Sequence, residues 1–90
     1  MPNAIEITLI GKPGCHLCET ALGVVDSVID EFVLAKAGNS VVLLEANILD
    51  DPELARKYGE EIPVVLVNGS QHSYWTVEAP RLLAKLQSLA

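Results

Sequence analysis

The sequence predicts an α/β fold in which a four-stranded mixed sheet is flanked by helices. Apolar residues alternate with a period of two near the N-terminus, and directly afterwards they recur with the period of a helix. The same change from strand to helix occurs twice more along the chain. The pair Asn68-Gly69, between two strand-like runs, adds a hairpin. The predicted order is therefore β-α-β-α-β-β-α, and its strand–helix–strand unit requires a parallel pair.

The first predicted strand covers residues 4–10. Ile5, Ile7 and Leu9 lie on one face of it at a period of two. Because the opposite face is also largely apolar, we expect this strand to be central in the sheet. A loop at residues 11–14, which contains two glycines and a proline, ends it.

A long amphipathic helix is predicted to begin at Cys15. Apolar residues recur there at steps of four and three over roughly five turns. This stripe consists of Cys18, Leu22, Val25, Ile29 and Phe32, widened by Ala21, Val28 and Val33. Gly38-Asn39 is a typical helix end.

Two further elements precede the hairpin. Residues 41–46 form an apolar run short enough to be a buried strand. The segment Asp50-Asp51-Pro52-Glu53 predicts the start of a short helix. Asp is a preferred N-cap, Pro is tolerated in the first turn, and Glu is favoured near the positive end of the helix dipole. Gly59 is expected to end this helix.

The C-terminal part predicts two antiparallel strands and a last helix. Residues 64–67 and 70–75 flank Asn68-Gly69 as the arms of the hairpin. The last helix is expected to open within residues 76–80, with Thr76 as its cap. Its apolar stripe consists of Leu82, Leu83, Leu86 and Leu89.

Length and composition restrict the class of protein. Ninety residues predict a single domain over residues 1–90, and a half-hydrophobic composition indicates a folded chain. The net charge is −6, and no basic stripe exists that could neutralise phosphates. Neither nucleic acid nor an anionic membrane is therefore an expected partner.

The sequence also favours a cytoplasmic location. The N-terminal residues 1–6 lack the basic region of a secretory signal, and no apolar stretch is long enough to span a membrane. We expect a cytoplasmic protein that acts as a monomer. In a reducing compartment, a close pair of cysteines is more often catalytic or metal-binding than structural.

The only two cysteines, Cys15 and Cys18, stand three positions apart at the junction of the first strand and helix. Helical positions at this spacing place their Cβ atoms about 5–6 Å apart, near what a disulfide requires. Cys18 lies on the apolar stripe, so we expect it to be a buried resolving thiol. Cys15 lies at the helix tip and is the expected nucleophile. The helix N-terminus and Lys12 should lower the pKa of the Cys15 thiol.

These features together resemble the thioredoxin fold and, within it, glutaredoxin-like proteins. The segment Lys12–Cys18 looks like the active-site loop of that family, Ile62-Pro63 like its cis-proline dipeptide, and Val67-Asn68-Gly69 like its last turn. The resemblance implies a dithiol thiol–disulfide oxidoreductase that takes part in electron transport. It implies that the backbone at Ile62 and Pro63 binds an extended substrate, and that Lys12 contacts a substrate carboxylate.

The sequence departs from the family in its partner-binding region. His16-Leu17 replaces the family's Pro-Tyr between the cysteines, and residues 73–78 lack the glycine pair and Asp that bind glutathione. No cofactor is expected, and this departure weakens the case for glutathione as co-substrate. The expected partners are protein or low-molecular-weight disulfides and a thiol reductant. His16 is interpreted either as a modulator of the thiolate or as a solvent-facing residue.

Two other functions remain open from the residues. The cysteine pair could belong to a metal or iron–sulfur module, although only two histidines accompany it and no metal is expected. The chain could also be a non-catalytic binding domain with the same fold. Tyr58, Tyr74 and Trp75 are interpreted as core or edge packing rather than as a binding site. His72 is interpreted as an ordinary strand residue.

Overall fold

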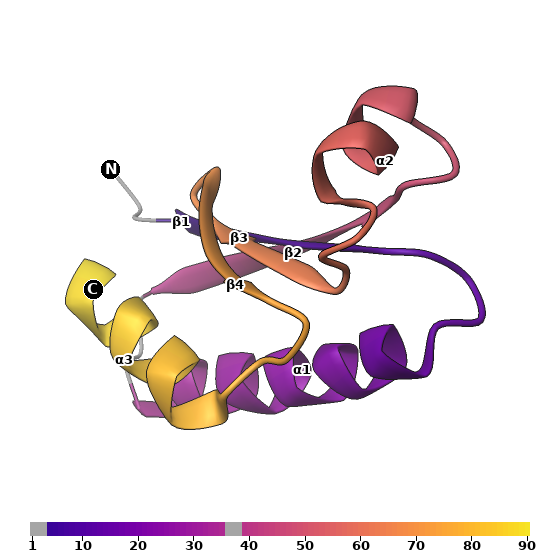
Figure 1. The fold of residues 1–90 in the computed structure, drawn as a ribbon. Coiled ribbons are helices and arrows are strands. Elements are labelled where there is room, and N and C mark those ends of the chain that lie inside the picture. Colours follow the sequence, from indigo (N-terminus) through magenta and orange to yellow (C-terminus); the bar gives the residue numbers. More distant parts are fainter. Residues whose placement is uncertain (1–3, 36–38) are drawn as a thin grey trace.

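The structure, a computed structural model, describes residues 4–35 and 39–90 and shows one sheet with helices on both faces (Figure 1). The elements are β1 (Ala4–Gly11), α1 (His16–Ala35), β2 (Ser40–Asn47), α2 (Pro52–Tyr58), β3 (Val64–Val67), β4 (Ser70–Tyr74) and α3 (Ala79–Leu89). The predicted order is confirmed. The helix end predicted at Gly38-Asn39 involves Gly38, which lies outside the described residues, as do the first three residues of the chain.

The strands are arranged in the order β2-β1-β3-β4, with β1 central as predicted. β1 and β2 are parallel, whereas β3 is antiparallel to both β1 and β4. The sheet is therefore mixed. The C-terminal ends of β1, β2 and β4 lie beside the N-terminal end of β3 at one end of the sheet. We call it the dithiol end, because Cys15 and Cys18 follow β1.

The helices divide the sheet into two unequal faces. α1 and α3 lie together on one face, and α2 covers the other face at one end only (Figure 1). The larger core cluster between α1, α3 and the sheet includes Ile7, Val25, Phe32 and Leu82. A smaller cluster of Ile10, Ile48, Tyr58 and Val64 is packed with Leu54 of α2. Apolar burial on both faces of β1 thus fixes the strand that leads to the cysteines.

Two predictions of burial are wrong. The second strand was expected to be buried, but β2 is an edge strand whose Val42 and Leu44 are each 45% exposed. They point to the face of the sheet that α2 leaves largely uncovered. Val33 is also exposed, since the buried stripe of α1 runs along one narrower line. That line consists of Cys18, Ala21, Val25, Val28 and Phe32.

The two short connections before α2 and α3 differ in their caps. Asp51 caps α2 as predicted, because its side chain accepts a hydrogen bond of 2.9 Å from the Glu53 N–H. The cap predicted at Thr76 is wrong. α3 begins three residues later, and its N-cap residue Glu78 makes no side-chain hydrogen bond to the helix. The packing of Leu82 and Leu86 against α1 therefore fixes this helix without help from a cap.

The hairpin at Asn68-Gly69 has the left-handed conformation at both central residues that an Asn-Gly turn favours, with φ of 51° and 84°. The Asn68 side chain also accepts a hydrogen bond of 2.9 Å from the Glu6 N–H, which ties the turn to β1. Among the described residues, no helix has the length and apolarity needed to cross a membrane.

We predict that Gly69→Ala destabilises the protein, because an L-residue with a side chain pays about 1–2 kcal/mol for this left-handed conformation. The free energy of unfolding in urea measures the effect. Gly23→Ala is the matched control: Gly23 lies in α1, and an added Cβ there meets no atom within 4 Å. That substitution should stabilise the protein by about 0.5–1 kcal/mol. Equal effects at both sites would contradict the assigned turn.

Candidate functional site

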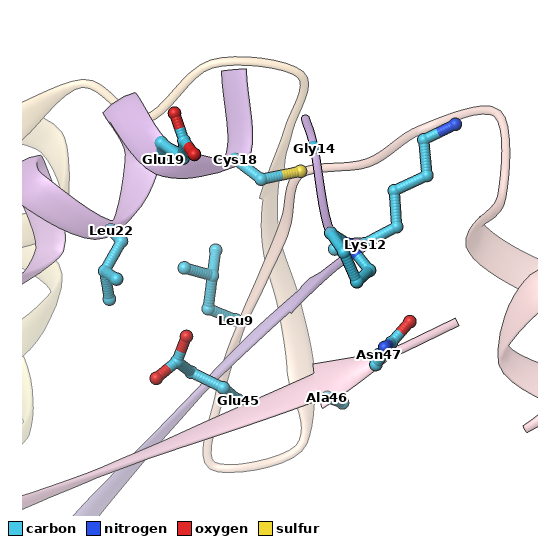
Figure 2. A pocket seen from close by; sticks show the side chains of 11 residues that line it. Leu9, Lys12, Gly14, Cys18, Glu19, Leu22, Glu45, Ala46 and Asn47 are labelled. Carbon is cyan, nitrogen blue, oxygen red and sulfur yellow. The ribbon is translucent and has the colours of Figure 1, made fainter. Parts of the chain in front are cut away.

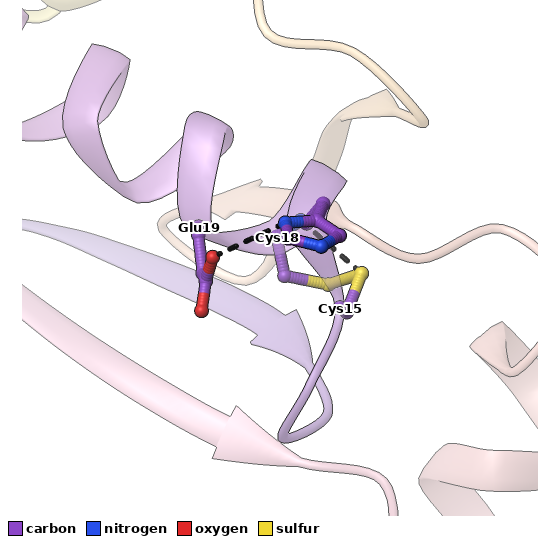
Figure 3. A network of polar contacts seen from close by, with 4 residues as sticks. Cys15, Cys18 and Glu19 are labelled. Carbon is purple, nitrogen blue, oxygen red and sulfur yellow. Dashed lines mark hydrogen bonds and ion pairs between the residues drawn. A yellow bond between two sulfur atoms is a disulfide. The ribbon is translucent and has the colours of Figure 1, made fainter.

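The candidate site is built where β1 passes into α1. Cys15 stands just before α1, and its carbonyl accepts a hydrogen bond of 3.1 Å from the Glu19 N–H. Cys18 lies one turn further, inside the helix. The two residues are joined by a disulfide, with their Cα atoms 5.2 Å apart (Figure 3). The spacing predicted to allow a reversible bond therefore does bring the two sulfurs together.

The two sulfurs lie in different environments. Cys18 is 9% exposed and belongs to the buried stripe of α1, as expected, whereas Cys15 is half-buried. The Cys15 Sγ accepts a hydrogen bond of 3.2 Å from the Cys18 N–H. This N–H is one of the free donors in the first turn of α1, so it would favour a negative charge on Cys15 after reduction.

Gly11, the last residue of β1, gives Cys18 the room it needs. A Cβ added at Gly11 would lie 2.8 Å from the Cys18 Sγ and 3.1 Å from its Cβ. Sequence reasoning treated Gly11 only as part of the loop that ends the strand. The structure instead pairs it with Asn47 of β2 and packs the Cys18 sulfur on it. Position 11 must lack a side chain because α1 packs closely against β1 there, and this contact cannot be seen in the sequence.

A pocket of about 300 Å³ opens beside Cys18, between α1 and the ends of β1 and β2 (Figure 2). Its apolar part is formed by Leu9 and Leu22, and the carboxylate residues Glu19 and Glu45 line its rim. Lys12 also lines it, but its ammonium end extends away from the Cys18 sulfur (Figure 2). The pocket gives solvent a route to the side of the dithiol that carries Cys18.

Ile62 and Pro63 stand immediately before β3, and the bond between them is cis. The pairing of Val64 with Ile10 places them at the dithiol end of the sheet. Pro63 is fully buried and Ile62 is half-buried. The topology thus brings both residues to the same end as the cysteines, although they are about 45 positions away in the sequence.

His16 is fully open to solvent. Its side chain is 99% exposed, and its Nδ1 lies 3.7 Å from a carboxylate oxygen of Glu19 (Figure 3). This geometry agrees with the solvent-facing interpretation.

His72 is half-buried in β4, where burial, followed by the positive charges of Arg81 and Lys85, lowers its pKa. The lowered pKa favours the neutral form of the His72 imidazole.

The prediction that all three aromatic residues pack in the core or at its edge is correct for Tyr58 but incomplete for Tyr74 and Trp75. Tyr58 is 7% exposed, whereas Tyr74 and Trp75 are 50% and 54% exposed at the dithiol end. The one sequence feature that hinted at this exposure is their position within residues 73–78, where the resemblance implies a glycine pair that this chain lacks.

Within the described ranges 4–35 and 39–90, no three His, Cys, Asp or Glu residues are grouped so that they could hold a metal ion.

Comparisons with known proteins agree with the geometry. Residues 6–87 match the family of the glutaredoxin-like domain (DUF836). Two uncharacterised proteins, Rv0508 of Mycobacterium tuberculosis and Mb0520 of Mycobacterium bovis, are each 31% identical over 91 residues. The match covers 90% of this chain and 81% of each relative.

Solved structures show the same fold. The X-ray structure of the protein XcR50 from X. campestris is similar with a TM-score of 0.68 and 29% identity, over 91% of this chain and 96% of that one. Chloroplastic thioredoxin z has a TM-score of 0.71 but 13% identity, over 97% of this chain and 79% of that one. The second likeness shows the thioredoxin fold alone.

We predict that Gly11→Ala destabilises the reduced protein by about 1–3 kcal/mol, because the added methyl group overpacks the Cys18 side chain. Denaturant unfolding under reducing conditions measures this loss. The same substitution in a Cys18→Ala background should cost clearly less, since the sulfur that the methyl group meets is gone. A cost that is equal in both backgrounds would show that Cys18 is not the neighbour that matters.

Proposed function

This chain belongs to the glutaredoxin-like domain family, and we propose that it is a thiol–disulfide oxidoreductase of the dithiol type. The observation that carries the proposal is the Cys15–Cys18 pair, which is joined at the tip of α1 with Cys18 buried and Cys15 partly exposed. A reversible disulfide at such a position serves exchange, because a partner disulfide can approach only one of the two sulfurs.

The reaction is a transfer of two electrons from the dithiol to a substrate disulfide. The Cys15 thiolate attacks one substrate sulfur, the substrate S–S bond breaks, and the leaving thiolate takes up a proton. Cys18 then loses its proton and attacks the Cys15 sulfur of the mixed disulfide. The second substrate thiol is released, and Cys15 and Cys18 remain oxidised. The Cys18 N–H, which already contacts Cys15 Sγ at 3.2 Å, supports the thiolate at the start of this sequence.

The other predicted residues have supporting roles in this proposal. The backbone beside Pro63 binds the substrate in an extended conformation, as strand addition requires. Ile62 is half-buried next to it, and Lys12, exposed on the loop before Cys15, attracts acidic groups of a substrate. His16 has at most an indirect effect on the Cys15 thiolate, because its side chain is exposed to solvent and its contact is with Glu19. The reaction itself needs no cofactor, and a thiol reductant in the cytoplasm returns the dithiol to its reduced form.

We predict that Cys15→Ser abolishes disulfide reduction, because the nucleophile is lost. Cys18→Ser should instead accumulate a mixed disulfide between Cys15 and the substrate, since the resolving thiol is lost. Mass spectrometry of acid-quenched reactions detects this adduct. Full activity of both variants, or an adduct on Cys18 in the Cys15→Ser variant, would contradict the assigned roles.

We also predict that the pKa of the Cys15 thiol lies below the value of about 8.5 for free cysteine. The helix N-terminus stabilises only the thiolate, so the shift is downward. Thiolate absorbance near 240 nm in the Cys18→Ser variant measures it, with the Cys15→Ser, Cys18→Ser double variant as the blank. The rate of attack on a disulfide should rise with pH through the same value and then level off. A titration at or above 8.5 would show that the helix does not activate Cys15.

A further inference from the structure

We propose that the substrate of this dithiol is a polypeptide disulfide, which Trp75 and Tyr74 grip beside Pro63, and that glutathione is not its preferred substrate. The proposal rests on the oxidoreductase function above and names the substrate class of the same site. The polypeptide carries an apolar residue and a lysine or arginine next to its cysteine.

Trp75 is positioned at the dithiol end by the pairing of the sheet. Tyr74, the last residue of β4, pairs with Val64, and Val64 directly follows Pro63. The two aromatic residues therefore stand beside the segment that is proposed to hold the substrate backbone. Tyr74 and Trp75 occupy part of the region in which the resemblance leads one to expect glycines that bind glutathione.

The conformation of Trp75 is strained and tightly held. Its φ is 66°, a left-handed value that is rare for a bulky residue and that persists only when surrounding contacts impose it. Its backbone N–H donates to the Glu61 carbonyl at 3.0 Å, and its indole N–H donates to the Glu60 carbonyl at 2.9 Å. The Tyr74 ring packs edge-on against it at 5.0 Å. These contacts hold an indole that is 54% exposed in a fixed position.

Several exposed apolar side chains lie at the dithiol end. Of the eight large hydrophobic residues that are exposed in the described parts of the chain, four lie at the dithiol end: Leu17, Leu49, Tyr74 and Trp75. Leu17 stands between the two cysteines and is 55% exposed. Such a surface suits a polypeptide with apolar side chains, because burying apolar area supplies the binding energy. Glutathione, a small peptide with two carboxylates, offers little to it.

The charge near Trp75 favours a basic partner. An open groove of about 870 Å³ runs beside Trp75, and its charged lining consists of Glu61, Glu78 and Arg81. His72 also lines it, and its lowered pKa favours the neutral imidazole. The chain as a whole carries −6. A lysine or arginine of the substrate would meet Glu61, Glu78 and the exposed indole in this groove, which Lys12 does not line.

The test uses the fully reduced protein in single-turnover reactions, so that no reductant has to be identified. One probe is bis(2-hydroxyethyl) disulfide, and the other is a disulfide-linked peptide whose cysteine is flanked by Leu and Arg. We expect Trp75→Ala to lower the rate constant for the peptide at least tenfold and to change that for the small disulfide less than twofold. Trp75→Phe, which keeps a ring, should lose less than Trp75→Ala.

Leu34→Ser is the matched control, because Leu34 is 86% exposed near the other end of α1. It should leave both rate constants unchanged. A second measurement uses the unmodified protein and does not depend on the folding of any variant. The peptide with Arg should react at least fivefold faster than the same peptide with Glu, and also faster than glutathione disulfide.

The outcomes separate this inference from the proposed function. If the unmodified protein reduces the small disulfide but does not prefer the Arg peptide over glutathione disulfide, or if Trp75→Ala slows both probes equally, the inference is overturned. If the unmodified protein reduces none of the disulfides, the oxidoreductase function itself fails. Preference for the Arg peptide together with its selective loss in Trp75→Ala establishes the aromatic grip.

Discussion

The packing of the Cys18 sulfur on Gly11 is the contact on which the site depends. It brings the first turn of α1 against the last residue of β1, where any side chain would push the helix away. The apolar stripe of α1 below it, with Val25 and Phe32 buried against the sheet, holds the helix in that position. The core thus determines where the helix tip stands, and the helix tip determines where Cys15 meets solvent.

This arrangement makes two chemically identical residues unequal. Cys18 is shielded by β1 and can react only with Cys15 or with what enters the small pocket beside it. Cys15 caps the helix, keeps part of its surface open and accepts an N–H from the first turn. The different roles proposed for the two thiols rest on this difference in burial and on the direction of the helix.

The opposite wall of the site comes from a different part of the chain. The segment before β3 and the residue after β4 meet through the hydrogen bonds of Trp75 to the carbonyls of Glu60 and Glu61. These bonds maintain the strained conformation of Trp75 and attach its indole to the segment that leads into Pro63. Tyr74 and Trp75 thus form an exposed aromatic edge in the region where the resemblance implies glycines.

The sequence by itself determined the order of the elements, the Asn68-Gly69 turn, the Asp51 cap and the different burial of Cys15 and Cys18. These features depend on local conformational preference and on periodicity, which are written in neighbouring residues. Tertiary structure alone decided that β2 lies at the edge, that Gly11 must lack a side chain, that α3 forms without the Thr76 cap, and that Trp75 faces solvent beside Pro63. Each of these depends on which distant segments come into contact. The pattern of residues along one strand or helix does not specify which element will pack against it.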